Sequence, residues 1–234
     1  MNNTRATILF LSLLILLVKA TDISAQVGTR AGAVIGGNIA SASFTSSMEG
    51  VSQSTRTGLL LGGIVEFGFS DNVCLRAEPM YVQNGAAITI VYSSASPSYK
   101  EIYELEYLEL PVHVKLQTGT GAVRPYIFGG PNLGILLAAS VTEEIPPPVG
   151  TLEESRQSGT QDIKDEISST NFVFDFGGGL TCDVSPTIQL QMDVRYSLGL
   201  SNIAKPPDPN DQSFQPDSWK SRDIKVLVGI LFAL

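Results

Sequence analysis

The segment TIQLQMDVRYSLGL (residues 187–200) places large apolar side chains at its even positions and polar or small side chains at its odd positions. The preceding segment NFVFDFGGGLTCD (residues 171–183) alternates in a similar way, and only Val184, Ser185 and Pro186 separate the two. Alternation with a period of two is typical of a β-strand with one apolar and one polar face. The two segments therefore predict a β-hairpin with strands longer than those of most globular domains.

The composition of the polar face favours a particular environment for this hairpin. It carries Gly, Ser, Gln and isolated charges, whereas the water-facing side of a soluble sandwich or a lipocalin-type barrel is usually richer in Lys and Glu. Small and amide side chains fit a narrow lumen better, and the large apolar face would then contact lipid. We therefore expect the apolar face of the hairpin to point outward and its polar face to point into the lumen, the reverse of the arrangement in a soluble protein.

Other segments with strand-like patterns alternate with connections that are sorted by length. The expected strands are 27–39, 57–69, 73–91, 102–117, 123–139, 171–183, 187–200 and 222–234. The long connections are 41–56, 92–100, 140–170 and 201–221, and the short ones are 70–72, 118–122 and 184–186. This order predicts an all-β fold, an eight-stranded antiparallel up-and-down transmembrane β-barrel with short periplasmic turns and long extracellular loops. The apolar pattern of 102–117 changes phase, which predicts a β-bulge near Tyr107 or Leu108.

The N-terminus has the features of a cleaved signal peptide. Arg5 precedes the apolar run Ile8–Val18, and a small residue, Ala25, precedes the expected cleavage point. We therefore expect a signal peptide at residues 1–25 and one barrel domain at 26–234, exported to the outer membrane. The net charge of −8 argues against nucleic-acid binding, which needs a basic surface.

The short turns predict which charged residues lie opposite one another. If Phe69 pairs with Val73, Glu66 lies opposite Arg76. If Asp183 pairs with Thr187, Asp175 lies opposite Arg195, and Gly177 lies opposite Asp193. Buried charges must be paired, so we expect a structural charge network in the lumen. Its expected members are Glu66, Arg76, Glu78, Glu109, Lys115, Asp175, Asp193 and Arg195.

Few residues point to chemistry. The single histidine, His113, lies about 13 Å along the strand from Glu109, too far for a direct contact, and we expect it to fill the lumen. Cys74 is expected to face inward and Cys182 outward, and whether they form a disulfide is left open. We expect no catalytic, cofactor-binding or metal-binding residue. The acids of 140–170 lack the spacing of a calcium loop, so a solvated loop is expected, and cation binding there is left open. Aromatic girdles at the membrane interfaces are expected from Tyr81, Tyr103, Tyr107, Phe172 and Tyr196.

Four strings in order resemble one family. They are EPMYVQNG (78–85), YLELP (107–111), PYIFGGP (125–131) and RYSLGLSNI (195–203). The chain thus resembles the PorT-like outer-membrane β-barrel proteins of Bacteroidota over most of its mature length. The resemblance implies an eight-stranded barrel in the outer membrane and implies little about activity. One branch of that family is associated with secretion of proteases, and no residue here places the chain in that branch.

The sequence leaves three functions open. The leading expectation is a non-enzymatic, monomeric barrel that is a structural anchor or an accessory to surface assembly or secretion, with binding through its outer loops. Its expected partners are outer-membrane lipid, lipopolysaccharide and other envelope proteins. The alternatives are a barrel enzyme acting on outer-membrane lipid and a soluble periplasmic barrel that carries a small apolar ligand.

Overall fold

The computed structural model describes residues 28–44, 51–90, 99–145, 157–205 and 219–234. Its strands are β1 (Thr29–Phe44), β2 (Val51–Gly68), β3 (Val73–Ala77), β4 (Met80–Ile90), β5 (Tyr99–Gln117), β6 (Val123–Ile145), β7 (Gln157–Asp162), β8 (Thr170–Asp183), β9 (Ile188–Gly199) and β10 (Trp219–Ala233). The described part of the chain contains no helix long and apolar enough to cross a membrane. The expected signal peptide lies outside the described residues.

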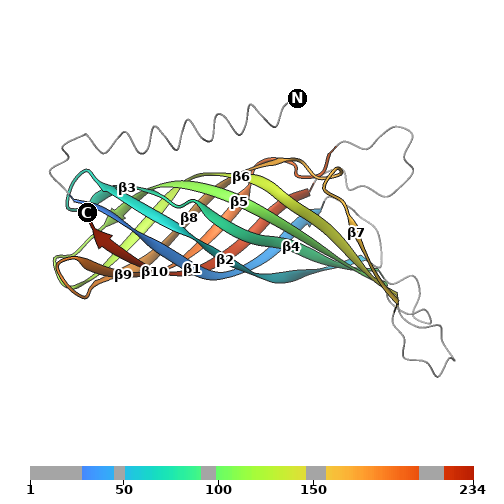
Figure 1. Cartoon of the computed structure of the whole chain (residues 1–234), viewed down its shortest axis with the longest axis horizontal. Coiled ribbons are helices and arrows are strands. Elements are labelled where there is room, and N and C mark those ends of the chain that lie inside the picture. The colour runs from blue at the N-terminus through green and yellow to red at the C-terminus, as the bar shows by residue number, and fades with distance from the viewer. Residues whose placement is uncertain (1–27, 45–50, 91–98, 146–156, 206–218) are drawn as a thin grey trace, which may run out of the picture.

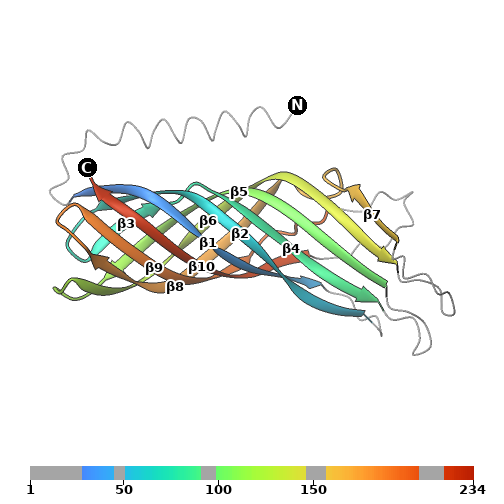
Figure 2. The same ribbon diagram turned by 60° about the horizontal axis from the view of Figure 1, so that its bottom comes forward.

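Eight strand positions close into a ring of antiparallel neighbours. β3 and β4 follow one another between β2 and β5 and share one position in the ring. β1 pairs with β10, from Arg30 opposite Ala233 to Phe44 opposite Trp219, and this pairing closes the ring. β7 pairs with β6 outside the ring. The predicted eight-stranded antiparallel barrel is therefore confirmed. Figures 1 and 2 show the tilted strands, with the C-terminus at the end that carries the short turns. We call this the turn end and the opposite end the loop end.

Burial alternates along the strands in the inside-out sense predicted from the sequence. In β9, Asp193 and Arg195 are each 1 % exposed, whereas the intervening Val194 is 49 % exposed. β8 behaves likewise, with Asp175 fully buried and Phe174 and Phe176 exposed. The apolar face of the barrel wall therefore points outward, as expected for contact with lipid.

The predicted register of the first hairpin is confirmed. The amide of Phe69 donates a 2.9 Å hydrogen bond to the carbonyl of Val73, and Glu66 lies opposite Arg76. The intervening residues 70–72 form a tight turn. A three-residue turn thus sets the charge pairing of the two strands it joins.

The predicted register of the hairpin 171–200 is wrong by two residues. Asp183 pairs with Gln189, so Asp175 lies opposite Ser197 and Gly177 opposite Arg195, while Gly179 lies opposite Asp193. The reason lies in the turn, where the Ser185 hydroxyl accepts hydrogen bonds from the amides of Thr187 and Ile188. Thr187 is therefore a turn residue and not the first paired residue. A shift of two residues keeps every side chain on its face, which is why the inward assignments still hold.

The strands differ from their predicted extents in identifiable places. The irregularity expected near Tyr107 is present in the β5–β6 register, but its extra residue is Leu137 of β6, because Glu106 pairs with Ala138 and Tyr107 with Leu136. The expected phase change of 102–117 is wrong, since Tyr107 and Glu109 are both buried. The expected strand 73–91 is instead interrupted at Glu78 and Pro79, because proline has no amide to donate to a neighbouring strand. Strand residues occur in all four segments expected to be long loops. They are 41–44 of β1, 51–56 of β2, 99–100 of β5, 140–145 of β6, the whole of β7, and 219–221 of β10.

Candidate functional site

The lumen brings together the charged residues that the sequence places on inward faces. Each of the eight is at most 4 % exposed. They come from β2, β3, the β3–β4 connection, β5, β8 and β9. The eight residues are Glu66, Arg76, Glu78, Glu109, Lys115, Asp175, Asp193 and Arg195. We call this set, together with Lys225 and His113, the charge network.

Arg76 is the hub of the network near the turn end. Its Nη2 lies 2.8 Å from Glu66 Oε1, and its Nη1 lies 3.1 Å from Asp193 Oδ2. Nη2 also donates to Gln191 Oε1 at 2.9 Å. Glu66 is held from a second side by Lys115, whose Nζ is 2.9 Å from the same oxygen. Charged hydrogen bonds of this kind are the strong ones, and here they join opposite walls of the barrel.

Arg195 continues the network toward the middle of the barrel. Its Nη1 lies 2.7 Å from Glu78 Oε2, and its Nη2 lies 3.1 Å from Asp193 Oδ1. His113 follows, with Nδ1 3.8 Å from Glu78 Oε2 and Nε2 3.4 Å from Asp175 Oδ2. The predicted direct pairing of Asp175 with Arg195 is therefore replaced by a chain that passes through Glu78 and His113.

A second cluster surrounds Glu109. Lys225 Nζ lies 2.5 Å from Glu109 Oε2, and Asn132 donates to the same oxygen at 2.7 Å. Asn132 also donates to Asp175 Oδ2 at 3.1 Å, which joins this cluster to His113. The charge network thus extends from Lys115 to Lys225 through ion pairs, the His113 imidazole and one amide.

Aromatic rings cover the cations on one side. The Arg76 guanidinium lies 4.9 Å from the ring centre of Tyr126, and that of Arg195 lies 5.2 Å from the ring centre of Phe128. Glycines on β8 leave space for both rings. A Cβ at Gly177 would lie 2.9 Å from Phe128 Cζ, and one at Gly179 would lie 2.7 Å from Tyr126 Cζ. The inward glycines of the hairpin therefore make room for the rings that shield the charges.

Sequence reasoning missed some members of this interior. Lys225 and Asp223 face inward from β10, where the exposed Ile224, Val226 and Val228 occupy the alternate positions. The same alternation that defined β9 could have identified them. Asn132 had no such signal, because its role depends on the approach of β5 and β8 to β6 from either side.

An apolar plug fills the lumen toward the loop end. We define it by the buried residues Ala86, Leu105, Tyr107, Leu136, Ala139, Val141, Ile163, Ile167, Ile203, Ala204 and Trp219. Tyr103 packs edge-on against Trp219, with ring centroids 5.1 Å apart. The connections after β7 and β9 contribute to the plug, because Ile167 forms a β-bridge with Ala204. Two tyrosines expected in interfacial girdles, Tyr103 and Tyr107, thus face the interior, because β5 keeps its alternation and places them on the same inward face as Glu109.

The wall continues past the plug on one side. β6 leaves β8 at Ile135 and extends to Ile145, paired with β5 on one edge and with β7 on the other. Figure 2 shows β4, β5 and β6 reaching farther than β1 at the loop end. Residues 158–162 of β7 are exposed, and no strand in the described part of the chain pairs with the second edge of β7. We call β7 and the adjoining part of β6 the outer sheet.

The remaining sequence-based expectations concern cysteine and metal chemistry. Cys74 and Cys182 are both free thiols, so no disulfide joins them. Among the described residues, no group of three or more His, Cys, Asp or Glu side chains is arranged to hold a metal ion. Much of the acidic segment 140–170 belongs to β6, β7 and the plug, and its residues 146–156 lie outside the described part.

One family of known proteins matches most of the chain, and several solved structures are similar to it. The family described as outer membrane protein beta-barrel domain matches residues 20–205. Neisserial surface protein A is similar at 15 % identity and a TM-score of 0.43, over 89 % of this chain and 98 % of that one. The outer membrane protein OprG from Pseudomonas aeruginosa is similar at 12 % identity and a TM-score of 0.44, over 88 % of this chain and 94 % of that one. No curated protein matches the sequence at a significant level.

Proposed function

Because the chain belongs to the outer membrane protein beta-barrel domain family, we propose that it is a non-enzymatic anchor in the outer membrane that binds envelope or surface proteins through its loop end. In this family's setting the turn end faces the periplasm and the loop end faces outward. The resemblance to the PorT-like proteins of Bacteroidota is compatible with an accessory role in surface assembly or secretion.

The observation that carries the proposal is the outer sheet. Spanning the membrane does not require strands that continue beyond the plug. β6 nevertheless extends to Ile145 and pairs there with β7. An unpaired strand edge offers a row of backbone donors and acceptors to which an extended peptide can add. The β7 sequence, QSGTQD, contains neither Lys nor Pro, the residues that commonly block such an edge.

The filled lumen supports an anchor over a transporter. Eight strands leave little interior space once inward side chains are in place. Here the charge network occupies the middle of the barrel, and the plug occupies the loop end. A soluble carrier of apolar ligands is disfavoured because the apolar faces of β8, β9 and β10 point outward.

The position of His113 argues against lipid chemistry. A barrel enzyme needs a nucleophile or an activated water beside a positioned base, at a place that the substrate can reach. His113 is fully buried between Glu78, Asp175 and the ring of Phe128. We expect lipid A from cells with the wild-type protein and from cells with His113→Ala to give the same mass spectrum, and a mass difference would revive the enzymatic alternative.

Site-specific photo-crosslinking tests the binding role directly. A photoreactive amino acid is placed at Thr160 in β7, and a matched exposed control is placed at Thr187 in a turn at the opposite end. We expect Thr160 alone to give a discrete protein adduct in intact outer membranes. The absence of any protein adduct at Thr160, or the same adducts from both positions, would contradict the proposal.

A further inference from the structure

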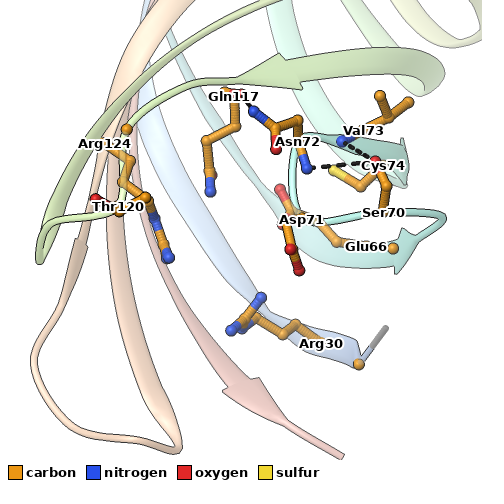
Figure 3. Close-up of a pocket in the computed structure, with 13 residues that line it drawn as sticks. Arg30, Glu66, Ser70, Asp71, Asn72, Val73, Cys74, Gln117, Thr120 and Arg124 are labelled. Carbon is orange, nitrogen blue, oxygen red and sulfur yellow. Dashed lines mark hydrogen bonds between the residues drawn. The ribbon is translucent and has the colours of Figure 1, made fainter. Parts of the chain in front are cut away.

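The turn end of the lumen contains a cavity that neither the charge network nor the anchor role explains. Its volume is about 380 Å³, and residues of β1, the β2–β3 turn, β5, the β5–β6 turn and β6 line it. Figure 3 shows its polar side chains, which include Arg30, Asp71, Cys74, Gln117 and Arg124. The cavity lies at the end where the barrel has no apolar plug.

Arg30 is the cation of this cavity for which the described residues provide no ion-pair partner. It lies directly opposite Glu66 in the β1–β2 register. Glu66 Oε1 is already held by Lys115 at 2.9 Å and by Arg76 at 2.8 Å. Among the described residues, Arg30 forms no ion pair, and a half-buried guanidinium without a counterion favours binding of an anion.

Two further donors converge on the same space from other walls. Figure 3 shows the nitrogen-bearing ends of Arg30, Arg124 and Gln117 directed into the cavity. Arg124 lines the cavity, and its Nη2 lies 2.5 Å from Asp183 Oδ2. The side-chain oxygen of Gln117 accepts a 3.3 Å hydrogen bond from Thr181, which leaves its amide hydrogens free to donate into the cavity.

Asp71 is the opposing charge of the site. It lies on the exposed β2–β3 turn and lines the cavity from the side opposite Arg124. Two acids line the cavity, Glu66 and Asp71. Glu66 is already paired with Arg76 and Lys115, and among the described residues Asp71 forms no ion pair, so Asp71 is the acid expected to repel a bound anion. This gives Arg30 and Asp71 opposite expected effects on binding.

We propose that the turn-end cavity is an oxyanion-binding site for a carboxylate or phosphate group of a periplasmic molecule. The planar guanidinium of Arg30 matches the geometry of both groups, with Arg124 and Gln117 as additional donors. The volume accommodates a small solute or the end of a larger chain, and it is open to the periplasmic side. This inference is independent of the partner that binds the loop end.

Cys74 gives a reporter inside the cavity. It is a free thiol among the lining residues, and the other cysteine, Cys182, is removed as Cys182→Ser. The rate of Cys74 modification is measured with a negatively charged sulfonatoethyl methanethiosulfonate and with a positively charged trimethylammonioethyl methanethiosulfonate. The ratio of the two rates reports the local potential, because a change in thiol ionisation affects both reagents equally.

The variants make opposite predictions. Loss of one charge near the thiol changes each rate severalfold in opposite directions, so Arg30→Gln should lower the anionic-to-cationic ratio by about tenfold. Asp71→Asn should raise the ratio. The matched control, Arg56→Gln, removes an arginine that is paired with Glu104 at the loop end, and it should leave the ratio unchanged.

Protection from modification then identifies the anion. Inorganic phosphate and acetate are added separately at constant ionic strength, with chloride as the balancing salt. We expect one or both to slow modification of Cys74 in the parent protein, with weaker protection in Arg30→Gln and stronger protection in Asp71→Asn. A preference for phosphate or acetate assigns the group. No protection by either anion, or weaker protection in Asp71→Asn, would overturn the proposal.

Discussion

The two halves of the lumen are filled by different physical means. In the middle and toward the turn end, the charge network joins residues from at least five strands through ion pairs such as Arg195–Glu78 at 2.7 Å. Toward the loop end, the plug packs Leu105, Tyr107 and Trp219 with their neighbours without a single charged member. The charged half depends on specific partners, whereas the apolar half depends on filled volume.

This difference predicts different tolerances to substitution. Removing one member of a buried ion pair leaves its partner as an uncompensated charge, which costs more than the pair itself contributes. An apolar core accepts side chains of similar volume because it has no directional bonds to lose. The following substitutions test this comparison, beginning with the largest expected effect.

Arg76→Met should give the largest loss. The change leaves Glu66 with Lys115 alone and removes one of the two cations that hold Asp193. We expect the free energy of unfolding to fall by about 3–5 kcal/mol. The measurement is urea unfolding of the barrel refolded into lipid vesicles, followed by heat-modifiable gel migration. A loss below about 1 kcal/mol would mean that water penetrates the network and screens its charges.

The pair Lys225–Glu109 tests whether such losses come from broken pairing. Lys225→Met and Glu109→Gln should each destabilise the barrel, because Nζ and Oε2 are 2.5 Å apart and both side chains are buried. The double variant should recover a coupling energy of about 1–3 kcal/mol relative to the sum of the single effects. Additive effects in the same unfolding assay would contradict a direct interaction.

Substitutions that nearly preserve side-chain volume separate the charged and the apolar half of the lumen most clearly. Glu78→Gln keeps the volume but removes the charge that faces Arg195, and we expect a loss of about 2–3 kcal/mol. Leu105→Met changes the shape of a plug residue without adding a charge, and we expect a loss below about 1.5 kcal/mol. Equal losses in chemical unfolding would mean that the two halves do not differ in specificity.

The ion pair Arg56–Glu104 at the loop end should contribute least. Arg56 Nη2 lies 2.6 Å from Glu104 Oε1, but the two side chains are 22 % and 44 % exposed. Arg56→Gln should cost about 0.2–1 kcal/mol, and the effect should shrink as salt is raised. A larger, salt-independent loss would indicate that this pair behaves like the buried ones.

The sequence predicted the charged half better than the apolar half. Alternation in 187–200 assigns Asp193 and Arg195 to the lumen because a strand has a strict period of two. The pairing of Asp175 failed because the turn geometry set by Ser185 is not visible in that alternation. The plug was missed because the change from apolar to charged residues on the inward face of 102–117, between Tyr107 and Glu109, looks like a phase change in the sequence. Ile163 and Ile167 also come from a segment without strand periodicity.

Planar-bilayer recording of the refolded wild-type protein tests the sealed lumen most directly. The charge network and the plug together fill the barrel between the turn-end cavity and the outer sheet. We predict no stepwise conductance above that of the bare bilayer, at either polarity. Stable, reproducible conductance steps from protein shown to be folded by heat-modifiable migration would contradict the sealed lumen, and with it the anchor role proposed for this barrel.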